Sequence, residues 1–360
     1  MFSKYRDQYD QLWKMFIRPP RASYTVLDLG PTLQTIGNIT VRRLDFELKN
    51  KNNYILKCSF FQALDSKTSQ QSSNICVIYL HGNAGCRIEG LSLLPFVIQN
   101  GMNFCCFDFA GCGLSEGEYI SLGIHEKDDV ILLKTNLKSK FGIKEVALWG
   151  RSMGGVTALH VGAKENDIFA MIADSPFIKL NRLAAEFAKE NKNFSTIFTS
   201  LIFSFVKKSI KKRANFNVDA LDQSAMIKQC KMPICFVTSK DDKFVKAYNV
   251  EELYKAYKGT KKLLYEKGDH NATRSYEFFL EGNKFLKENL LAKIIPDFQG
   301  KNDSEERKSI DEGKNGQRKP KLTQADIIKK FSIMNQRFEE NFGGKAFPIQ
   351  NNYYAPSAQI

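Results

Sequence analysis

The sequence predicts an α/β fold built on one mostly parallel, doubly wound sheet. Short apolar runs fall at residues 75–80, 104–107, 146–149, 169–173 and 234–237, and segments with a helical spacing of apolar residues lie between them. Each run is apolar at nearly every position, which is typical of strands buried on both faces of a sheet. Because parallel strands need long crossover connections, this alternation favours parallel pairing.

Size and composition fit one large globular domain with appendages. The chain has 360 residues, of which 43% are hydrophobic and 26% are charged. No apolar run approaches the ~18–20 residues of a membrane span, and no signal peptide is predicted at the N-terminus. The eight cysteines form no paired Cys-x-x-Cys and are expected to be free thiols. We therefore expect a cytoplasmic protein without a metal site.

The formal net charge of +14 has three interpretations: a solvated lysine-rich surface, binding to an anionic membrane surface, or binding to nucleic acid. Most lysines are scattered, apart from the run at 207–213, and no nucleic-acid motif is present. We favour the solvated surface and keep peripheral membrane contact as the second reading. No nucleic-acid partner is expected.

The N-terminal segment, residues 1–20, is predicted to form an amphipathic helix. Aromatic and aliphatic residues recur every three or four positions from Phe2 to Phe16, and Pro19 and Pro20 end the pattern. We favour docking of this helix on the domain's own surface. A peripheral membrane anchor is the alternative, because tryptophan, phenylalanine and basic residues suit a headgroup interface.

Residues 21–296 are predicted to form the main domain, which begins with an antiparallel hairpin of strands at 41–48 and 54–64. Between residues 177 and 232 the alternation of strands and helices stops. Three amphipathic helices are expected there, at 180–190, 197–206 and 221–227. A helical insertion after a strand is a candidate lid over the carboxyl ends of the strands.

The composition changes after the last helix of the domain, which is expected at 276–289. Residues 297–322 are polar and mixed in charge, which predicts a linker. Residues 323–360 contain a short amphipathic pattern, which predicts a helix followed by a tail. Docking of this helix on the domain and binding of a partner are both open.

The candidate nucleophile is Ser152, in the Gly-x-Ser-x-Gly motif of residues 150–154. A short apolar strand precedes the motif and a helix-compatible run follows it, which is the setting of a nucleophile elbow. The flanking glycines remove Cβ atoms that would collide at so sharp a turn. We therefore expect the Ser152 hydroxyl to stand exposed above the sheet.

A serine nucleophile needs a base, and the chain has four histidines, at 81, 125, 160 and 270. His160 points away along the helix that starts at Ser152. His81 ends a strand before the elbow, and His125 precedes a helix. Elimination selects His270, in a loop after the last strand.

The base needs an acid that orients it, and this acid is expected just after the strand at 234–237. Asp241 and Asp242 both stand there. The strand-end pattern Gly-x-x-Asp-x-x-Val, aligned on residues 239–245, selects Asp242, with Asp241 as the alternative. A capping role is the other reading for either aspartate.

The backbone amides of Asn83 and Met153 are expected to form an oxyanion hole. Residues 81–85, His-Gly-Asn-Ala-Gly, end a strand in a glycine-rich turn, where N–H groups can approach a ligand oxygen. An ordinary strand-to-helix turn is the alternative. The chain order Ser152, Asp242, His270 is that of the α/β-hydrolase fold.

Five segments together resemble the BEM46-like, serine-aminopeptidase-like (S33) branch of the α/β-hydrolases. They are residues 81–85, 108–117, 150–155, 174–177 and 268–271. The similarity extends over residues 19–290 and implies the fold and a serine hydrolase. This branch includes thioesterases, protein depalmitoylases, esterases and proteins named as peptidases, so the resemblance leaves the substrate open.

The sequence thus predicts a serine hydrolase that cleaves acyl esters or thioesters through Ser152, His270 and Asp242, with an acyl-enzyme intermediate. The expected substrate is an acylated small molecule, lipid or protein. No cofactor or metal is required. An aminopeptidase-like amide hydrolase and a non-catalytic binding protein with this fold are the alternatives.

Overall fold

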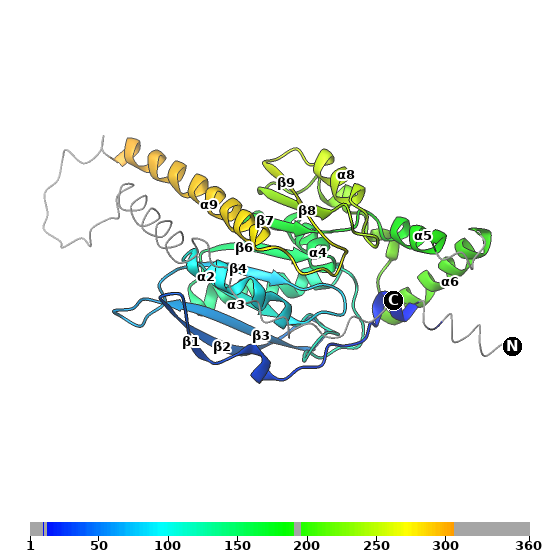
Figure 1. Ribbon diagram of the computed structural model, residues 1–360, viewed down its shortest axis with the longest axis horizontal. Helices are drawn as coiled ribbons and strands as arrows, with labels where there is room; N and C mark the ends of the chain where they lie inside the picture. Colours follow the sequence, from blue (N-terminus) through cyan, green and yellow to red (C-terminus); the bar gives the residue numbers. More distant parts are fainter. Residues whose placement is uncertain (1–9, 11–12, 191–195, 306–360) are drawn as a thin grey trace, which may run out of the picture.

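The computed structural model describes residues 10, 13–190 and 196–305, which form a nine-stranded sheet covered by helices on both faces (Figure 1). The strands are β1 (Leu33–Ile36), β2 (Ile39–Lys49), β3 (Ile55–Leu64), β4 (Ile75–Leu80), β5 (Asn103–Phe107), β6 (Glu145–Arg151), β7 (Ile168–Asp174), β8 (Ile234–Ser239) and β9 (Lys261–Glu266). Their order across the sheet is β1-β2-β3-β5-β4-β6-β7-β8-β9. Pairs among β1, β2, β3 and β5 are antiparallel, and the pairs from β5–β4 to β8–β9 are parallel. The predicted mostly parallel sheet is confirmed.

Burial explains why the central strands are apolar throughout. Every residue of β5, β7 and β8 is buried, because helices cover both faces of these strands. In β2, by contrast, buried and exposed positions alternate along part of the strand. The edge strand β1 was not predicted, since it has four residues and none is fully buried. It joins β2 through a two-residue turn that begins at Gly37, whose φ is 62°.

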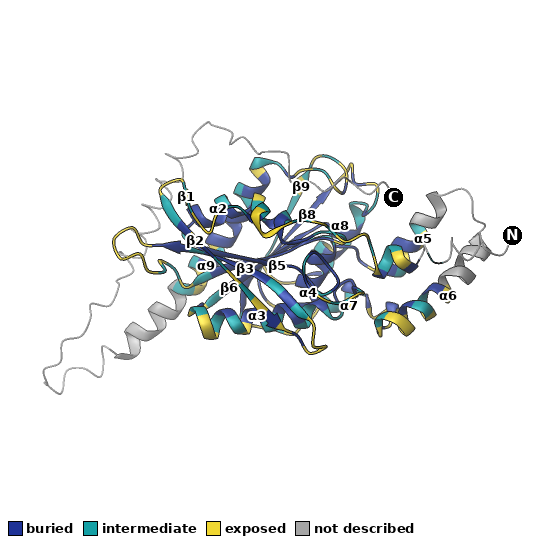
Figure 2. Cartoon of the chain, turned by 90° about the horizontal axis from the view of Figure 1, so that it is seen from below, coloured by how far each residue is buried: buried dark blue, intermediate teal, exposed yellow. Residues whose placement is uncertain are grey.

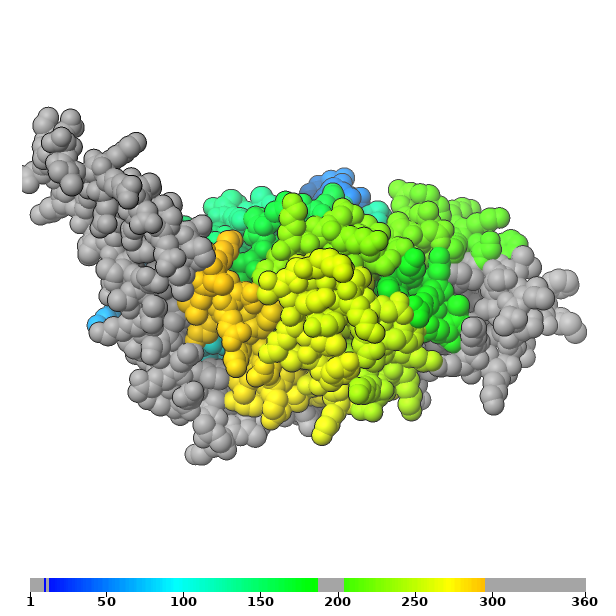
Figure 3. Space-filling view, turned by 90° about the horizontal axis from the view of Figure 1, so that it is seen from above, coloured from blue at the N-terminus to red at the C-terminus, as the bar shows by residue number. Residues whose placement is uncertain are grey.

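The helices are η1 (Val26–Leu29), η2 (Arg87–Ser92), α2 (Leu94–Gln99), α3 (Glu126–Phe141), α4 (Met153–Gly162), α5 (Leu180–Glu190), α6 (Thr196–Ala214), η3 (Val218–Ala220), α7 (Gln223–Met226), α8 (Tyr248–Ala256) and α9 (Tyr276–Glu305). Side chains of α3, α4 and α8 share one apolar core, and those of α2 and α9 share the core on the other face of the sheet. The sheet is therefore doubly wound. Figure 3 shows the face on which β9, α8 and α9 gather, in yellow to orange.

The helical insertion between β7 and β8 is present where it was predicted. Helices α5 and α6 project beside the sheet (Figures 1 and 2), while η3 and α7 lead back to β8. Helix α6 ends at Ala214, eight residues beyond the predicted end at Val206. Lysine and arginine are good helix formers and are favoured near a helix C-terminus, so the basic run at 207–213 extends the helix.

The described part of the N-terminal segment docks on the domain. Residues 13–17 are helical, and Trp13 and Ile17 are buried in the main apolar core. At the other end, α9 continues through Glu305, so residues 297–305 are helical rather than linker. The boundary was placed at Pro296, but a proline inside a helix can kink it without ending it. The remaining predicted linker, 306–322, and the predicted helix and tail, 323–360, lie outside the described residues. Among the described helices, none has both the length and the apolar character required to cross a bilayer.

Candidate active site

Ser152 sits at a sharp turn between β6 and α4. Its φ of 52° and ψ of −115° are unusual for a residue with a side chain, and its N–H donates to the Asp174 carbonyl oxygen at 2.7 Å. A Cβ on Gly154 would lie 1.9 Å from the Leu80 carbonyl oxygen, and one on Gly150 would lie 2.1 Å from the Gly154 carbonyl oxygen. The glycines of the motif are therefore required by the packing of this turn.

Three side chains from distant parts of the chain are linked by hydrogen bonds in the order Asp242–His270–Ser152, which we call the row. His270 Nε2 lies 2.9 Å from Ser152 Oγ, and His270 Nδ1 lies 2.7 Å from Asp242 Oδ2. The carboxylate next to Nδ1 favours a proton on that nitrogen, which leaves Nε2 free to accept the serine proton. His270 and Asp242 are buried, whereas Ser152 is partly exposed. Such a row has the geometry to activate a serine hydroxyl.

Asp242, and not Asp241, faces the imidazole. The second carboxylate oxygen of Asp242 accepts hydrogen bonds from the backbone N–H groups of Phe244 and Val245 at 2.9 and 2.7 Å. Asp241 is exposed and accepts a hydrogen bond from the Gly268 N–H instead. The two neighbouring aspartates thus have different tasks, because one fixes the imidazole and the other fixes the loop before it.

Arg151, the residue before the serine, holds the loop that carries His270. One terminal nitrogen of its guanidinium donates to the carbonyl oxygens of His270 and Ala272 at 2.8 and 2.9 Å. The ring of Phe244 packs edge-on against the imidazole, with ring centres 5.1 Å apart. Sequence reasoning missed Arg151, because the motif leaves that position open and its spacing carries no information about side-chain direction.

A buried ion pair joins the end of β7 to the same loop. The Arg274 guanidinium contacts both Asp174 oxygens, at 2.8 and 3.0 Å, and also donates to the Ala272 carbonyl oxygen. Burial alone would raise the pKa of Asp174, but the neighbouring Arg274 charge holds this pKa below its ordinary value. Asp174 therefore remains ionised and acts as a brace beneath the site.

The two predicted oxyanion donors flank Ser152. Met153 begins α4 directly after the serine, and a Cβ on Gly82 would lie 3.8 Å from Ser152 Cβ, so the turn with Asn83 is adjacent. Within the described part of the chain, neither the Asn83 N–H nor the Met153 N–H donates to a backbone carbonyl in a turn or loop. His81 secures the turn, since its Nε2 accepts from the Phe109 N–H and its Nδ1 lies 2.8 Å from the Gly82 carbonyl oxygen.

Comparison with known proteins finds hydrolase-like relatives over part of the chain. Residues 72–226 match the family model described as serine aminopeptidase, S33. The uncharacterized protein YqkD of Bacillus subtilis is 30% identical over 199 residues, which are 54% of this chain and 64% of that protein. The lysophosphatidylserine lipase ABHD12 of Danio rerio is 32% identical over 122 residues, 32% of this chain and 31% of that protein. The match thus spans less than two thirds of either relative.

Solved structures carry the same fold over a larger share of the chain. The Pyrococcus furiosus esterase Pf2001 superposes with a TM-score of 0.58 and 24% identity, over 76% of this chain and 98% of that structure. An acetyl xylan esterase from Thermoanaerobacterium superposes with a TM-score of 0.51 and 14% identity, over 79% of this chain and 93% of that structure. The chain has the α/β-hydrolase fold.

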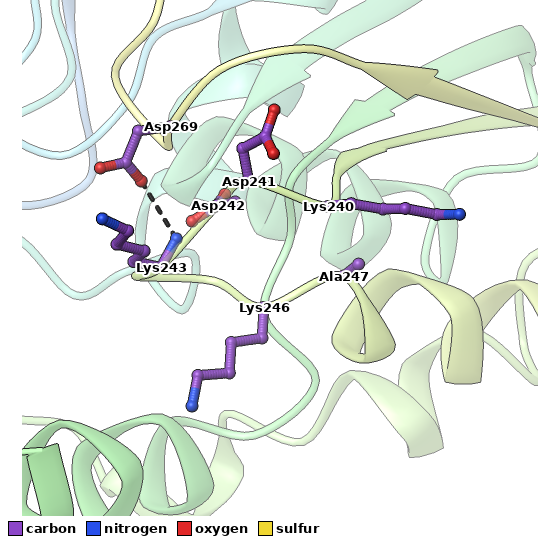
Figure 4. Close-up of a pocket in the computed structure, with 7 residues that line it drawn as sticks. All are labelled: Lys240, Asp241, Asp242, Lys243, Lys246, Ala247 and Asp269. Atoms are coloured by element: carbon purple, nitrogen blue, oxygen red, sulfur yellow. Dashed lines mark hydrogen bonds between the residues drawn. The ribbon is translucent and has the colours of Figure 1, made fainter.

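An open cavity of about 840 Å³ borders the Asp242 end of the row (Figure 4). It is lined by Lys240, Asp241, Asp242, Lys243, Lys246, Ala247 and Asp269. Asp269 accepts hydrogen bonds from the backbone N–H groups of Lys243 and His270, which ties two loops together. The lining is charged and mixed in sign, so this cavity is suited to water and polar groups rather than to an acyl chain.

His160 and His125 lie in environments separate from that of His270. Burial lowers the pKa of His160 to about 4, so this histidine is neutral at physiological pH. His125 Nε2 lies 3.2 Å from the Ala214 carbonyl oxygen, at the end of α6. Over the described ranges, His, Cys, Asp and Glu side chains form no group of three or more that is suited to a metal ion.

Proposed function

We propose that this chain, which has the α/β-hydrolase fold, is a serine hydrolase that cleaves acyl esters or thioesters. The observation that carries the proposal is the row Asp242–His270–Ser152, with the serine at a strained turn and the imidazole buried. Each member occupies the position that its part requires: a partly exposed hydroxyl, a base within hydrogen-bond distance, and a fixed carboxylate behind it.

The first half of the proposed reaction forms an acyl-enzyme. His270 Nε2 takes the proton of Ser152 as Oγ attacks the acyl carbon, and Asp242 stabilises the resulting imidazolium. The amides of Asn83 and Met153 donate to the oxyanion. The tetrahedral intermediate then collapses, the bond to the leaving oxygen or sulfur breaks, and His270 gives its proton to that atom.

The second half releases the acyl group. A water molecule attacks the ester carbon on Ser152 while His270 takes one of its protons. The bond to Ser152 Oγ then breaks, the proton returns to that oxygen, and a carboxylic acid leaves. The net reaction consumes one water and yields an acid and an alcohol or thiol, without a cofactor.

The names of one relative and of the matched family bear on the leaving group. The Danio rerio relative is named as a lipase, which favours ester substrates, and the matched family model is named for an aminopeptidase, which favours amides. We favour esters and thioesters, with amide hydrolysis as the second candidate. For the compartment we propose the cytoplasm, and the eight buried free cysteines support a reducing environment.

The test is turnover of matched chromogenic esters, thioesters and anilides that share a series of acyl chains. We expect ester or thioester turnover by the wild type and its loss in Ser152→Ala. Ser139→Ala, on the distant exposed part of α3, is the matched control and should keep full activity. Turnover of anilides alone would favour the peptidase. Absence of turnover on every substrate would favour the non-catalytic binding protein.

A further inference from the structure

The C-terminal half of α6 carries several exposed basic side chains beside an exposed aromatic ring. Val206 and Ile210 are buried against the domain. Phe205 is 50% exposed, and Lys208 Nζ lies 5.5 Å from the centre of its ring. Since positions 205, 208 and 212 are three and four apart, Phe205, Lys208 and Lys212 share the outward face of the helix.

Three lysines of this face have no carboxylate partner among the residues that the structure describes. Lys207 pairs with Asp219 at 2.6 Å, but among the described residues no carboxylate forms an ion pair with Lys208, Lys211 or Lys212. Arg213 stacks on the Trp13 ring at 4.1 Å, and the exposed Lys14 lies on the same ring at 5.7 Å. We call this set the α6 cationic surface: Lys14, Phe205, Lys208, Lys211, Lys212 and Arg213.

The α6 cationic surface lies on the side of the sheet where the parallel strands end, which is also the side that carries Ser152. The end of α6 contacts the start of α3 through His125 Nε2 and the Ala214 carbonyl oxygen. Helix α3 begins at the edge where the parallel strands end, and Ser152 follows the end of β6 at this same edge. Figure 2 shows α5 and α6 projecting from the sheet, with exposed positions on the described part of α6.

We propose that the α6 cationic surface binds the surface of anionic phospholipid membranes. Lysine and arginine side chains are attracted to anionic headgroups, and a phenylalanine among them suits the boundary between headgroups and acyl chains. Helix α6 projects beside the sheet (Figures 1 and 2), and Phe205, Lys208 and Lys212 are exposed on it. A nucleic acid is the less favoured partner, because the sequence carries no nucleic-acid motif beside these cations. This interaction is independent of the chemistry at Ser152.

The test is co-sedimentation of the full chain with vesicles of phosphatidylcholine alone and of phosphatidylcholine mixed equally with phosphatidylserine. We expect binding to the mixed vesicles only. The triple variant Lys208→Gln/Lys211→Gln/Lys212→Gln should bind about a hundredfold more weakly, since each lysine near an anionic surface contributes a factor of about five. Replacing Phe205 by serine should weaken binding by a smaller factor.

The matched control is Lys67→Gln/Lys140→Gln/Lys144→Gln, which removes the same charge from exposed lysines at the opposite edge of the sheet. It should bind within about twofold of the wild type. Ser152→Ala should also bind normally, which separates this proposal from the proposed function. Equal binding by the two triple variants would overturn the proposal, as would wild-type binding to both vesicle types alike, to neither, or to duplex DNA in preference to the mixed vesicles.

Discussion

The loop that carries His270 and the helical insertion after β7 lie at the same edge of the sheet but differ in how their polar groups are bound. In the loop, carbonyl oxygens are held by Arg151 and Arg274, and both oxygens of Asp242 have partners. In the insertion, Lys208, Lys211 and Lys212 of α6 are exposed. The proposed reaction geometry therefore depends on buried hydrogen bonds, whereas the proposed membrane contact depends on exposed charge.

Removal of the negative charge behind the imidazole is expected to have the largest effect on activity. Asp242→Asn is expected to lower kcat/KM by about 10⁴-fold, because the amide no longer favours the required tautomer of His270. Asp241→Asn, one residue earlier and exposed, should change kcat/KM by less than about tenfold. Steady-state kinetics on the best ester measures both variants, and equal losses would contradict the assignment of Asp242.

Breaking the buried brace should cost stability rather than chemistry alone. Asp174→Ala leaves Arg274 buried without its partner, and the free energy of unfolding should fall by about 3–5 kcal/mol. The exposed pair of Arg182 and Glu252 in the insertion is the control, since Glu252→Gln should cost about 0–1 kcal/mol. Urea denaturation compares the two variants. A small loss for Asp174→Ala would show that the loop is held without this pair.

The buried carboxyl group of Asp129 should make the free energy of unfolding depend on pH. Burial raises the pKa of Asp129 to about 7, so the folded chain keeps this proton while the unfolded chain releases it near the ordinary value of 3.8. This group's contribution is therefore present at low pH and is lost as pH rises through about 7, by up to about 4 kcal/mol.

Asp129→Asn should remove that loss, because its amide oxygen still accepts from Asn50 but does not titrate. Urea denaturation at about pH 5 and about pH 8 measures the difference. His160 acts in the opposite sense, since its lowered pKa costs stability as pH falls from 6.5 towards about 4. An unchanged pH dependence in Asp129→Asn would refute the role given to this carboxyl group.

The smallest expected effect concerns the positioning of the imidazole. Arg151→Ala should lower kcat by about 10–100-fold with little change in KM, because the His270 loop loses two hydrogen bonds while the row itself remains. Arg151→Lys should recover part of the loss. Arg182→Ala, in the insertion, is the control and should leave kcat near the wild-type value. A loss confined to KM would indicate a role in substrate binding instead.

The features that could be predicted from the sequence are those that depend on a local pattern of residues. The turn at Ser152 is readable because its glycines are sterically required, and His270 was selected because few histidines compete with it. Arg151 and the partnership of Asp174 with Arg274 were not found, since these contacts join residues about a hundred positions apart. The short edge strand β1 and the continuation of α9 past Pro296 also lacked a strong local signal.

Ser152 is the proposed nucleophile, and peptide mapping of a covalent adduct shows whether it reacts. The folded chain is treated with a fluorophosphonate, digested and analysed by mass spectrometry, alongside Ser152→Ala and chain unfolded in urea. We predict one adduct, on the peptide that contains Ser152, and none in either control. An adduct on a different residue, or the absence of an adduct in the folded wild type, would contradict the account.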